Sequence, residues 1–142
     1  MLDLKDIKKC ENNKYGEISN GIYEIKKSKF YSYIFAASSV SKIEDIIKVI
    51  KKDNKKARHV VYAYNFKDEN GVLHSKFSND NEPQGTGVNS IISMLEKENV
   101  TNYLVVIVRY FGGTLLGAGP LLRSYLTSFK EAYEKIKKNK SL

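Results

Sequence analysis

The segment RYFGGTLLGAGPLLRSY, residues 109–125, places four glycines between two arginines, directly behind an apolar run. Backbone N–H groups in a glycine loop, the N-terminus of a following helix and guanidinium groups all attract anions. The segment could therefore hold a phosphate, a carboxylate or an RNA backbone group beside Arg109 and Arg123. It could instead be structural, with Gly112 and Gly113 forming a tight turn and Arg109 paired with a carboxylate. The sequence leaves both interpretations open.

Two phosphate-binding patterns do not fit this segment. A Walker A loop needs Lys and then Ser or Thr after its second glycine, but Ala118 and Gly119 follow Gly117. A dinucleotide fingerprint needs a third glycine where Leu122 stands. We therefore expect no cofactor.

The segment NDNEPQGTG, residues 79–87, carries two carboxylates that could form an acid–base pair or neutralise an arginine. Read as a calcium loop that begins at Asp80, it has Ile91 where a bidentate Glu is required, which excludes an EF-hand. A turn that leads into the following helix is the preferred interpretation. Asp80, Glu82 and Thr86 are therefore candidate ligand contacts beside the glycine segment.

Histidine and cysteine are too few for most metal or nucleophile chemistry. His59 lies on a predicted strand without a Cys or second His at ligand spacing, and no Ser-His-Asp or Cys-His pattern is visible. The single Cys10 cannot form an internal disulfide. We therefore expect no catalytic residue and no metal site, while His59 stays a candidate binding residue.

The most hydrophobic run, YLVVIVRY at residues 103–110, predicts a central strand because it is apolar on both faces. This strand would deliver Arg109 and Tyr110 to its C-terminal end, just before the glycines. The other predicted strands are the pair GIYEI and KFYSYIFAA, then HVVYAYNF, then VLHSKFS, which returns after an Asn-Gly turn.

Three helices complete the predicted fold. The first has the capping-box spacing of Ser41 and Glu44, the second begins near Thr86, and the third opens at Pro120. The expected fold class is α+β in two layers, with three helices packed on a mixed β-sheet of about four to five strands.

Length and composition suit one soluble domain. The 142 residues are 42% hydrophobic and 28% charged. The N-terminal sequence has no signal-peptide core, and no apolar run is long enough to span a bilayer, so we expect a cytoplasmic protein without a membrane partner. The expected division is a polar lead-in over residues 1–20, one domain over 21–138 and a tail over 139–142.

The net charge of +8 lies on the flanks of the glycine segment rather than around it. Residues 1–60 carry a net +6, and residues 125–142 carry a net +3. Four lysines repeat on one face of the first predicted helix: Lys48, Lys51, Lys52 and Lys55. Such a stripe is either a solvated helix face or a basic surface for RNA.

Four ordered blocks together resemble the signature of the Impact family (imprinted and ancient): KKSKF, ARHVVYAY, SNDNEPQGTG and VIVRYFGGTLLGAGPLLRSY. The resemblance spans residues 21–135. The candidate binding residues on matching positions are His59, Asp80, Glu82, Thr86, Arg109, Tyr110, Gly112, Gly113 and Arg123. The third block departs most from the family pattern, because Asn79 and Asn81 replace an Asp and a Gly.

The resemblance implies a fold similar to domain IV of elongation factor G and to ribosomal-protein-type domains. It also implies a non-enzymatic module that acts in translation or its stress regulation, by binding RNA, the ribosome or a translation-regulatory protein. Two alternatives stay open. One is a protein that binds a small ligand or phosphate, or an enzyme, in the glycine-rich cleft; the other is a protein–protein adaptor.

Because the sequence shows no cluster of metal ligands, we predict that a chelator leaves the melting temperature unchanged. Thermal denaturation with and without EDTA measures this. A fall of several degrees, or stoichiometric zinc in the purified protein, would contradict the prediction.

Overall fold

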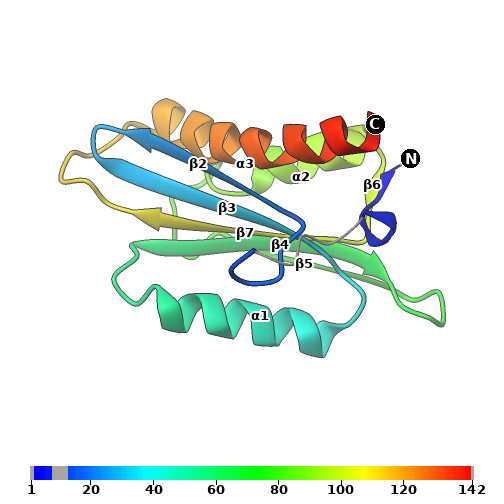
Figure 1. Cartoon of the computed structure of the whole chain (residues 1–142). Helices are drawn as coiled ribbons and strands as arrows, with labels where there is room; N and C mark the ends of the chain where they lie inside the picture. The colour runs from blue at the N-terminus through cyan, green and yellow to red at the C-terminus, as the bar shows by residue number, and fades with distance from the viewer. Residues whose placement is uncertain (1, 8–12, 142) are drawn as a thin grey trace.

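A five-stranded antiparallel sheet forms the centre of the structure, a computed structural model that describes residues 2–7 and 13–141, with side chains described up to residue 138. Cys10 lies outside the described residues. The strands of this sheet are β2 (Ser19–Ile25), β3 (Ser28–Ala36), β4 (His59–Lys67), β5 (Leu73–Ser78) and β7 (Tyr103–Tyr110). Their order across the sheet is β2-β3-β7-β4-β5, which puts β7 in the middle (Figure 1).

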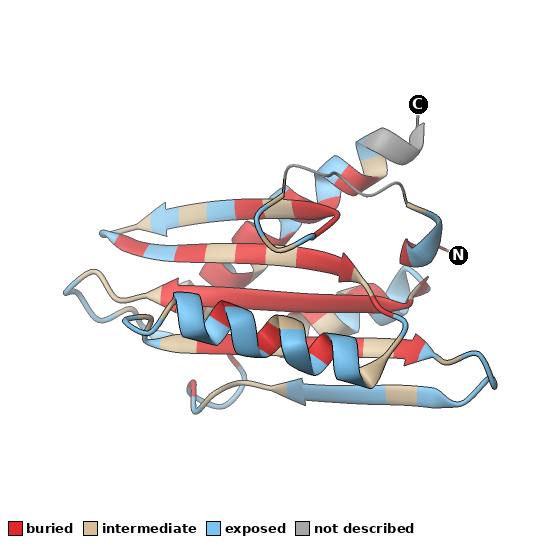
Figure 2. Ribbon diagram, turned by 60° about the horizontal axis from the view of Figure 1, so that its bottom comes forward, coloured by how far each residue is buried: buried red, intermediate tan, exposed pale blue. Residues whose placement is uncertain are grey.

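The central position of β7 confirms what its apolar sequence predicts. Every residue from Tyr103 to Arg109 is buried, as Figure 2 shows along the length of the strand. The strand pairs antiparallel with β3 on one side and with β4 on the other. Because both faces of β7 are apolar, both faces of the sheet must be covered.

Helices cover the two faces of the sheet. Helix α1 (Val40–Asp53) lies on one face, and α2 (Asn89–Lys97) and α3 (Ala118–Ser141) lie on the other (Figure 1). The buried apolar residues accordingly form two clusters, one between α1 and the sheet and one between the sheet and the other two helices. The side chains of β7 alternate between these clusters, as the period of a strand requires.

The α+β class, the three helices and the five strands are confirmed, but two details of the expected fold are wrong. The structure has three layers rather than two, because β7 needs cover on both sides. The five-stranded sheet is antiparallel throughout rather than mixed. Among the described residues, parallel pairing occurs only between the two-residue strands β1 (Leu2–Asp3) and β6 (Val100–Thr101). The likeness to domain IV of elongation factor G stays a prediction.

The N-terminal residues take part in the core. The short strand β1 leads into a 3-10 turn, η1 (Leu4–Asp6), and Leu2, Leu4 and Ile18 are buried in the cluster beneath α2 and α3. The expected polar lead-in over residues 1–20 therefore includes apolar anchors. Among the described residues, no helix has the length and apolar character needed to cross a membrane.

Helix α1 begins two residues earlier than its capping-box spacing predicts. Ser39, not Ser41, is the N-cap, and its hydroxyl accepts a hydrogen bond from the backbone N–H of Lys42 at 3.4 Å. The apolar stripe of Ile43, Ile47 and Ile50 is buried against the sheet. The four lysines Lys48, Lys51, Lys52 and Lys55 are all exposed, but only the first three lie on α1, because the helix ends at Asp53 and Lys55 is in the turn that follows.

Helix α3 approaches the sheet closely because Gly21 on β2 has no side chain. A Cβ at this position would lie 2.4 Å from the carbonyl oxygen of Ser128 and 2.7 Å from the backbone nitrogen of Ala132. Two serine contacts fix the same approach. The Ser19 hydroxyl donates to the carbonyl of Ala132 at 2.7 Å, and the hydroxyl oxygens of Ser32 and Ser128 are 2.7 Å apart.

We predict that Gly21→Ala lowers the free energy of unfolding by about 1–3 kcal/mol, since α3 must move away from β2 to admit the methyl group. Urea denaturation measures the change. Gly117→Ala is the matched control, because a Cβ there meets only an ordinary contact at 3.7 Å and its effect should stay within about 0.5 kcal/mol. Equal effects of the two substitutions would contradict the prediction.

Candidate functional site

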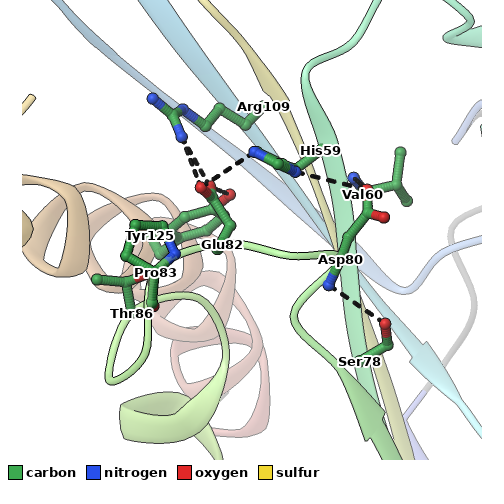
Figure 3. A network of polar contacts seen from close by, with 9 residues as sticks. All are labelled: His59, Val60, Ser78, Asp80, Glu82, Pro83, Thr86, Arg109 and Tyr125. Atoms are coloured by element: carbon green, nitrogen blue, oxygen red, sulfur yellow. Dashed lines mark hydrogen bonds and ion pairs between the residues drawn. The ribbon is translucent and has the colours of Figure 1, made fainter. Parts of the chain in front are cut away.

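Three of the predicted site residues meet at one end of the sheet. Arg109 is the second-last residue of β7, and its neighbour across the ladder is His59, the first residue of β4. Glu82 reaches them from the loop that joins β5 to α2. Figure 3 shows its carboxylate between the guanidinium of Arg109, the imidazole of His59 and the hydroxyl of Tyr125 on α3.

The carboxylate of Glu82 is the centre of this group, which we call the Glu82 network: His59, Glu82, Arg109 and Tyr125. Nη1 of Arg109 donates to both carboxylate oxygens, at 2.7 Å to Oε1 and 2.9 Å to Oε2. Nε2 of His59 lies 3.2 Å from Oε1. The hydroxyl of Tyr125 donates to Oε2. The sequence left open a pairing of Arg109 with Asp80 or Glu82, and the structure shows the pairing with Glu82.

Burial makes these contacts strong and also makes them necessary. The side chain of Glu82 is 1% exposed and that of Arg109 is 7% exposed, so each charge has lost nearly all of its water. An isolated buried charge is very costly, and the partner charge with its hydrogen bonds offsets that cost. Burial and the negative charge of Glu82 both raise the pKa of Tyr125, which keeps the phenol protonated as a donor.

The β5–α2 loop has a fixed shape that directs Glu82 inward. Asp80 and Asn81 adopt positive φ angles of 47° and 64°, and the backbone N–H of Glu82 donates to the carbonyl of Asn79 at 2.9 Å. One Asp80 oxygen accepts the backbone N–H of Val60 at 2.9 Å and lies 3.8 Å from Nδ1 of His59. Asp80 therefore ties the loop to β4 (Figure 3).

Thr86, another predicted contact, closes the second half of that loop. It is buried, and its hydroxyl donates to the carbonyl of Pro83 at 2.6 Å. Its backbone N–H also points to the same carbonyl, at 3.1 Å. Both donors of Thr86 thus serve the turn, three residues before α2 begins at Asn89.

The first glycine after β7 serves close packing. The backbone N–H of Gly112 donates to the Ser28 hydroxyl at 3.0 Å. A Cβ on Gly112 would lie 2.2 Å from the carbonyl carbon of Lys27, on the turn between β2 and β3. Gly113 has a φ of 95°, which a residue with a side chain rarely adopts. These two glycines therefore allow the chain to leave β7 against the neighbouring hairpin.

Two of the predicted site residues lie elsewhere. Tyr110 follows Arg109 and so points to the opposite face of the sheet, where its hydroxyl donates to Oδ1 of Asn54 at 2.5 Å. Arg123 lies on α3 and lines a separate cavity with Tyr23 and Lys26. The sequence predicts that Arg109 and Arg123 converge on one anion, but the structure places them at two separate sites.

The Glu82 network holds no surplus of positive charge. Glu82 neutralises Arg109, and Asp80 adds a second carboxylate beside His59. An added anion would have to displace Glu82 from the buried guanidinium. Nε of Arg109 is buried without a hydrogen-bond acceptor among the described residues, and the guanidinium carbon lies 5.9 Å from the ring centroid of Phe30. No group of three or more His, Cys, Asp or Glu side chains in the described part of the chain is placed to hold a metal ion.

The sequence reasoning missed the role of Tyr125. Its spacing on the last helix predicts a buried residue, and the structure confirms that Tyr125 is wholly buried. A buried tyrosine hydroxyl almost always has a hydrogen-bond partner. That rule could have identified Tyr125 as a contact for one of the carboxylates.

Residues 26–133 match the Impact N-terminal domain. The chain belongs to the Impact family. It is 34% identical over 113 residues to an IMPACT family member of Haemophilus influenzae, an alignment that covers 80% of this chain and 55% of that protein. This chain spans about half the length of the bacterial relatives it matches.

Two solved structures share the fold. The crystal structure of a hypothetical protein superposes with a TM-score of 0.72 at 28% identity and covers 83% of this chain and 57% of its own. The two-domain translational regulator Yih1 superposes with a TM-score of 0.58 at 19% identity, over 94% of this chain and 50% of that one. The Impact family match and the shared fold agree with the resemblance drawn from the four sequence blocks.

We predict that Arg109→Met lowers the free energy of unfolding by about 3–5 kcal/mol, because it leaves the buried Glu82 carboxylate without its counter-ion. Urea denaturation measures the change. The matched control is Arg58→Met, since Arg58 is exposed and stacks over the ring of Phe111 at 4.4 Å, a contact worth about 0.5–1 kcal/mol. A small effect of Arg109→Met together with a loss of anion binding would show instead that Arg109 serves a ligand.

Proposed function

We propose that this chain is a non-enzymatic module that acts in translation or its regulation by binding RNA or the ribosome. The observation that carries the proposal is the exposed lysine face of α1. Lys48, Lys51, Lys52 and Lys55 point to solvent, and none of the four is in an ion pair with a described residue. Three of them share one face of α1 and Lys55 follows in the turn after the helix. Unpaired surface lysines grouped in this way suit a phosphate backbone, because binding there releases counterions.

The Glu82 network supports the non-enzymatic part of the proposal. Its acid, its base and its cation contact each other, and Glu82 and Arg109 are buried, so the acid and the cation already have each other as partners. Gly112, at the start of the glycine-rich segment, packs against the β2–β3 turn, and the cavity that Gly117 and Arg123 line is separate from the Glu82 network.

The process named in the proposal comes from relatives. Family membership supports a role shared with other Impact proteins. Yih1, which shares the fold, is described as a translational regulator. The domain that we assign to this role covers residues 21–138, and a cytoplasmic location and a role in stress regulation belong to the same proposal.

A protein–protein adaptor is a second candidate, favoured by the edge strand β5. Leu73 and Phe77 on this strand are 58% and 51% exposed, and β4 is its only partner strand in the described sheet. An exposed apolar edge strand can accept a strand from another protein. A partner that stays bound after RNase treatment would distinguish this candidate from RNA binding.

We predict that replacing Lys48, Lys51, Lys52 and Lys55 by Gln weakens RNA binding and reduces its salt dependence. The measurement is the affinity for RNA from cell extract, and for purified ribosomes, as a function of salt concentration. Each phosphate contact that is lost should reduce the slope of log affinity against log salt by about 0.7–0.9.

A charge-matched variant separates this face from net charge alone. It replaces four exposed lysines on other surfaces: Lys67, Lys97, Lys130 and Lys138. The proposal expects the control to bind with nearly the wild-type salt slope. If both variants change the slope equally, α1 is only a solvated face; if the wild-type protein binds neither RNA nor ribosomes, the proposed function is wrong.

A further inference from the structure

One face of the sheet is only partly covered. Helix α1 packs against β7 and β4, and Figure 2 shows β2 and β3 beside it without a helix in front of them. A cavity of about 540 Å³ lies at this place, within the common size range of ligand sites. Asn54 lines it together with six residues that we call the tyrosine–lysine face: Lys14, Lys27, Lys29, Tyr31, Tyr33 and Tyr110.

The aromatic half of this face follows from strand geometry. Lys29, Tyr31 and Tyr33 alternate along β3, so all three side chains point to the same side of the sheet. Tyr110 at the end of β7 is the ladder partner of Lys29 and brings a third ring beside them. Tyr31 and Tyr33 are only partly buried, so their rings remain accessible to a ligand.

Neighbouring groups hold these rings in place. The ring of Tyr31 meets that of Tyr110 edge-on at 6.0 Å, and the ring of Tyr33 meets that of Tyr15 in the same way at 5.1 Å. Asn54, at the end of α1, accepts from the hydroxyl of Tyr110 and donates to the hydroxyl of Tyr15 at 3.2 Å. The aromatic wall is therefore organised before any ligand arrives.

The basic half of the face has no counter-charge in the cavity. Lys14, Lys27 and Lys29 are exposed, and none of the three is in an ion pair with a carboxylate in residues 2–7 and 13–141. No acidic residue lines the cavity. Glu24 is the ladder partner of Lys29 on β2, but it is not within ion-pair distance. The cavity therefore presents three positive charges beside three aromatic rings.

The turn between β2 and β3 adds an independent observation. Lys26 and Lys27 form this two-residue turn with φ angles of 48° and 68°, a conformation for which Gly, Asn and Asp are preferred. A residue with a side chain pays a conformational energy to adopt a positive φ angle, and residues with such strain are often found at functional positions. The strained turn places Lys27 at the cavity, and Gly112 packs closely against the backbone of this turn.

Aromatic rings beside unpaired lysines match the chemistry of a nucleic-acid single strand. Bases stack on the rings and lysines contact the phosphates between them, whereas a duplex hides its base faces. A second hollow of about 410 Å³ shares Lys14, Tyr31 and Tyr33 with the first and continues along β2. Glu17 also lines it, but this carboxylate is buried and accepts from the backbone N–H of Tyr15 at 2.8 Å and from the amide of Asn20 at 3.1 Å. Two adjoining hollows suit a strand of several nucleotides better than one free nucleotide.

We propose that the tyrosine–lysine face binds single-stranded RNA, with bases stacked on Tyr31 and Tyr33 and phosphates on Lys14, Lys27 and Lys29. This inference rests on the proposed RNA-binding function and assigns it a surface distinct from the lysines of α1. The other occupant with similar chemistry, a free nucleotide, is an outcome of the test.

The test is fluorescence anisotropy of a short labelled single-stranded RNA with the full chain. Tyr31→Leu and Tyr33→Leu each keep the apolar bulk but remove the ring, and each should weaken binding by about 5- to 150-fold, the effect of losing one stacked base. Tyr31→Phe keeps the ring and should bind as the wild type does. Tyr23→Leu is the matched control, because Tyr23 lies on the same hairpin but packs on the opposite side of the sheet. Urea denaturation of each variant confirms that it is folded.

The outcomes separate this inference from the proposed function. If the wild-type protein binds RNA but the Tyr31 and Tyr33 variants bind equally well, the tyrosine–lysine face is not the site, and RNA binding through α1 survives. Equal affinity for duplex RNA, or for a free mononucleotide, would also overturn the inference. If no RNA binds at all, both proposals are wrong.

Discussion

The buried pair of Arg109 and Glu82 is the interaction on which the rest of this end of the molecule depends. The second-last residue of a strand buried on both faces is an arginine that is itself 6% exposed, and a charge in that position must be neutralised. The counter-ion comes from a distant loop, and the same carboxylate is contacted from β4 and from α3. One ion pair therefore joins four parts of the chain that are far apart in sequence.

Because of this constraint, the proposed function assigns no catalytic role to the residue types that most often catalyse reactions. His59, Glu82 and Arg109 have the types expected of an acid–base or anion site, yet each contacts another member of the network. The proposed binding surfaces are instead those where charge is not matched. Those surfaces are the lysine face of α1 and the tyrosine–lysine face of the sheet, where cations have no carboxylate partner among the described residues.

Sequence reasoning predicted the parts of the structure that follow from local patterns. The apolar run of β7 indicated a central strand, and the hairpins and three helices follow from turn residues and periodicity. The sequence alone could not show whether Asp80 or Glu82 is the partner of Arg109. That choice depends on positive φ angles at Asp80 and Asn81, which turn one carboxylate toward β4 and the other inward.

Two further features depend on how helices sit on the sheet. The period of two along a strand already implies that Arg109 and Tyr110 point to opposite faces. The same period groups Lys29, Tyr31 and Tyr33 on one side of β3. Whether that side is open could not be predicted, because it depends on where α1 packs. Helix α1 covers β7 and β4, since the matching apolar cluster lies there, and no helix covers β2 on that side, whereas α3 packs on its other side.

A double-mutant cycle on Glu82 and Arg109 tests the central claim most directly. The free energies of unfolding of the wild type, Glu82→Gln, Arg109→Met and the double variant give the coupling between the two side chains. A structural ion pair should give a favourable coupling of about 2–3 kcal/mol, with the double variant more stable than the sum of the single losses would allow. Losses that add to within about 0.5 kcal/mol would show that the two side chains act independently and would contradict this account.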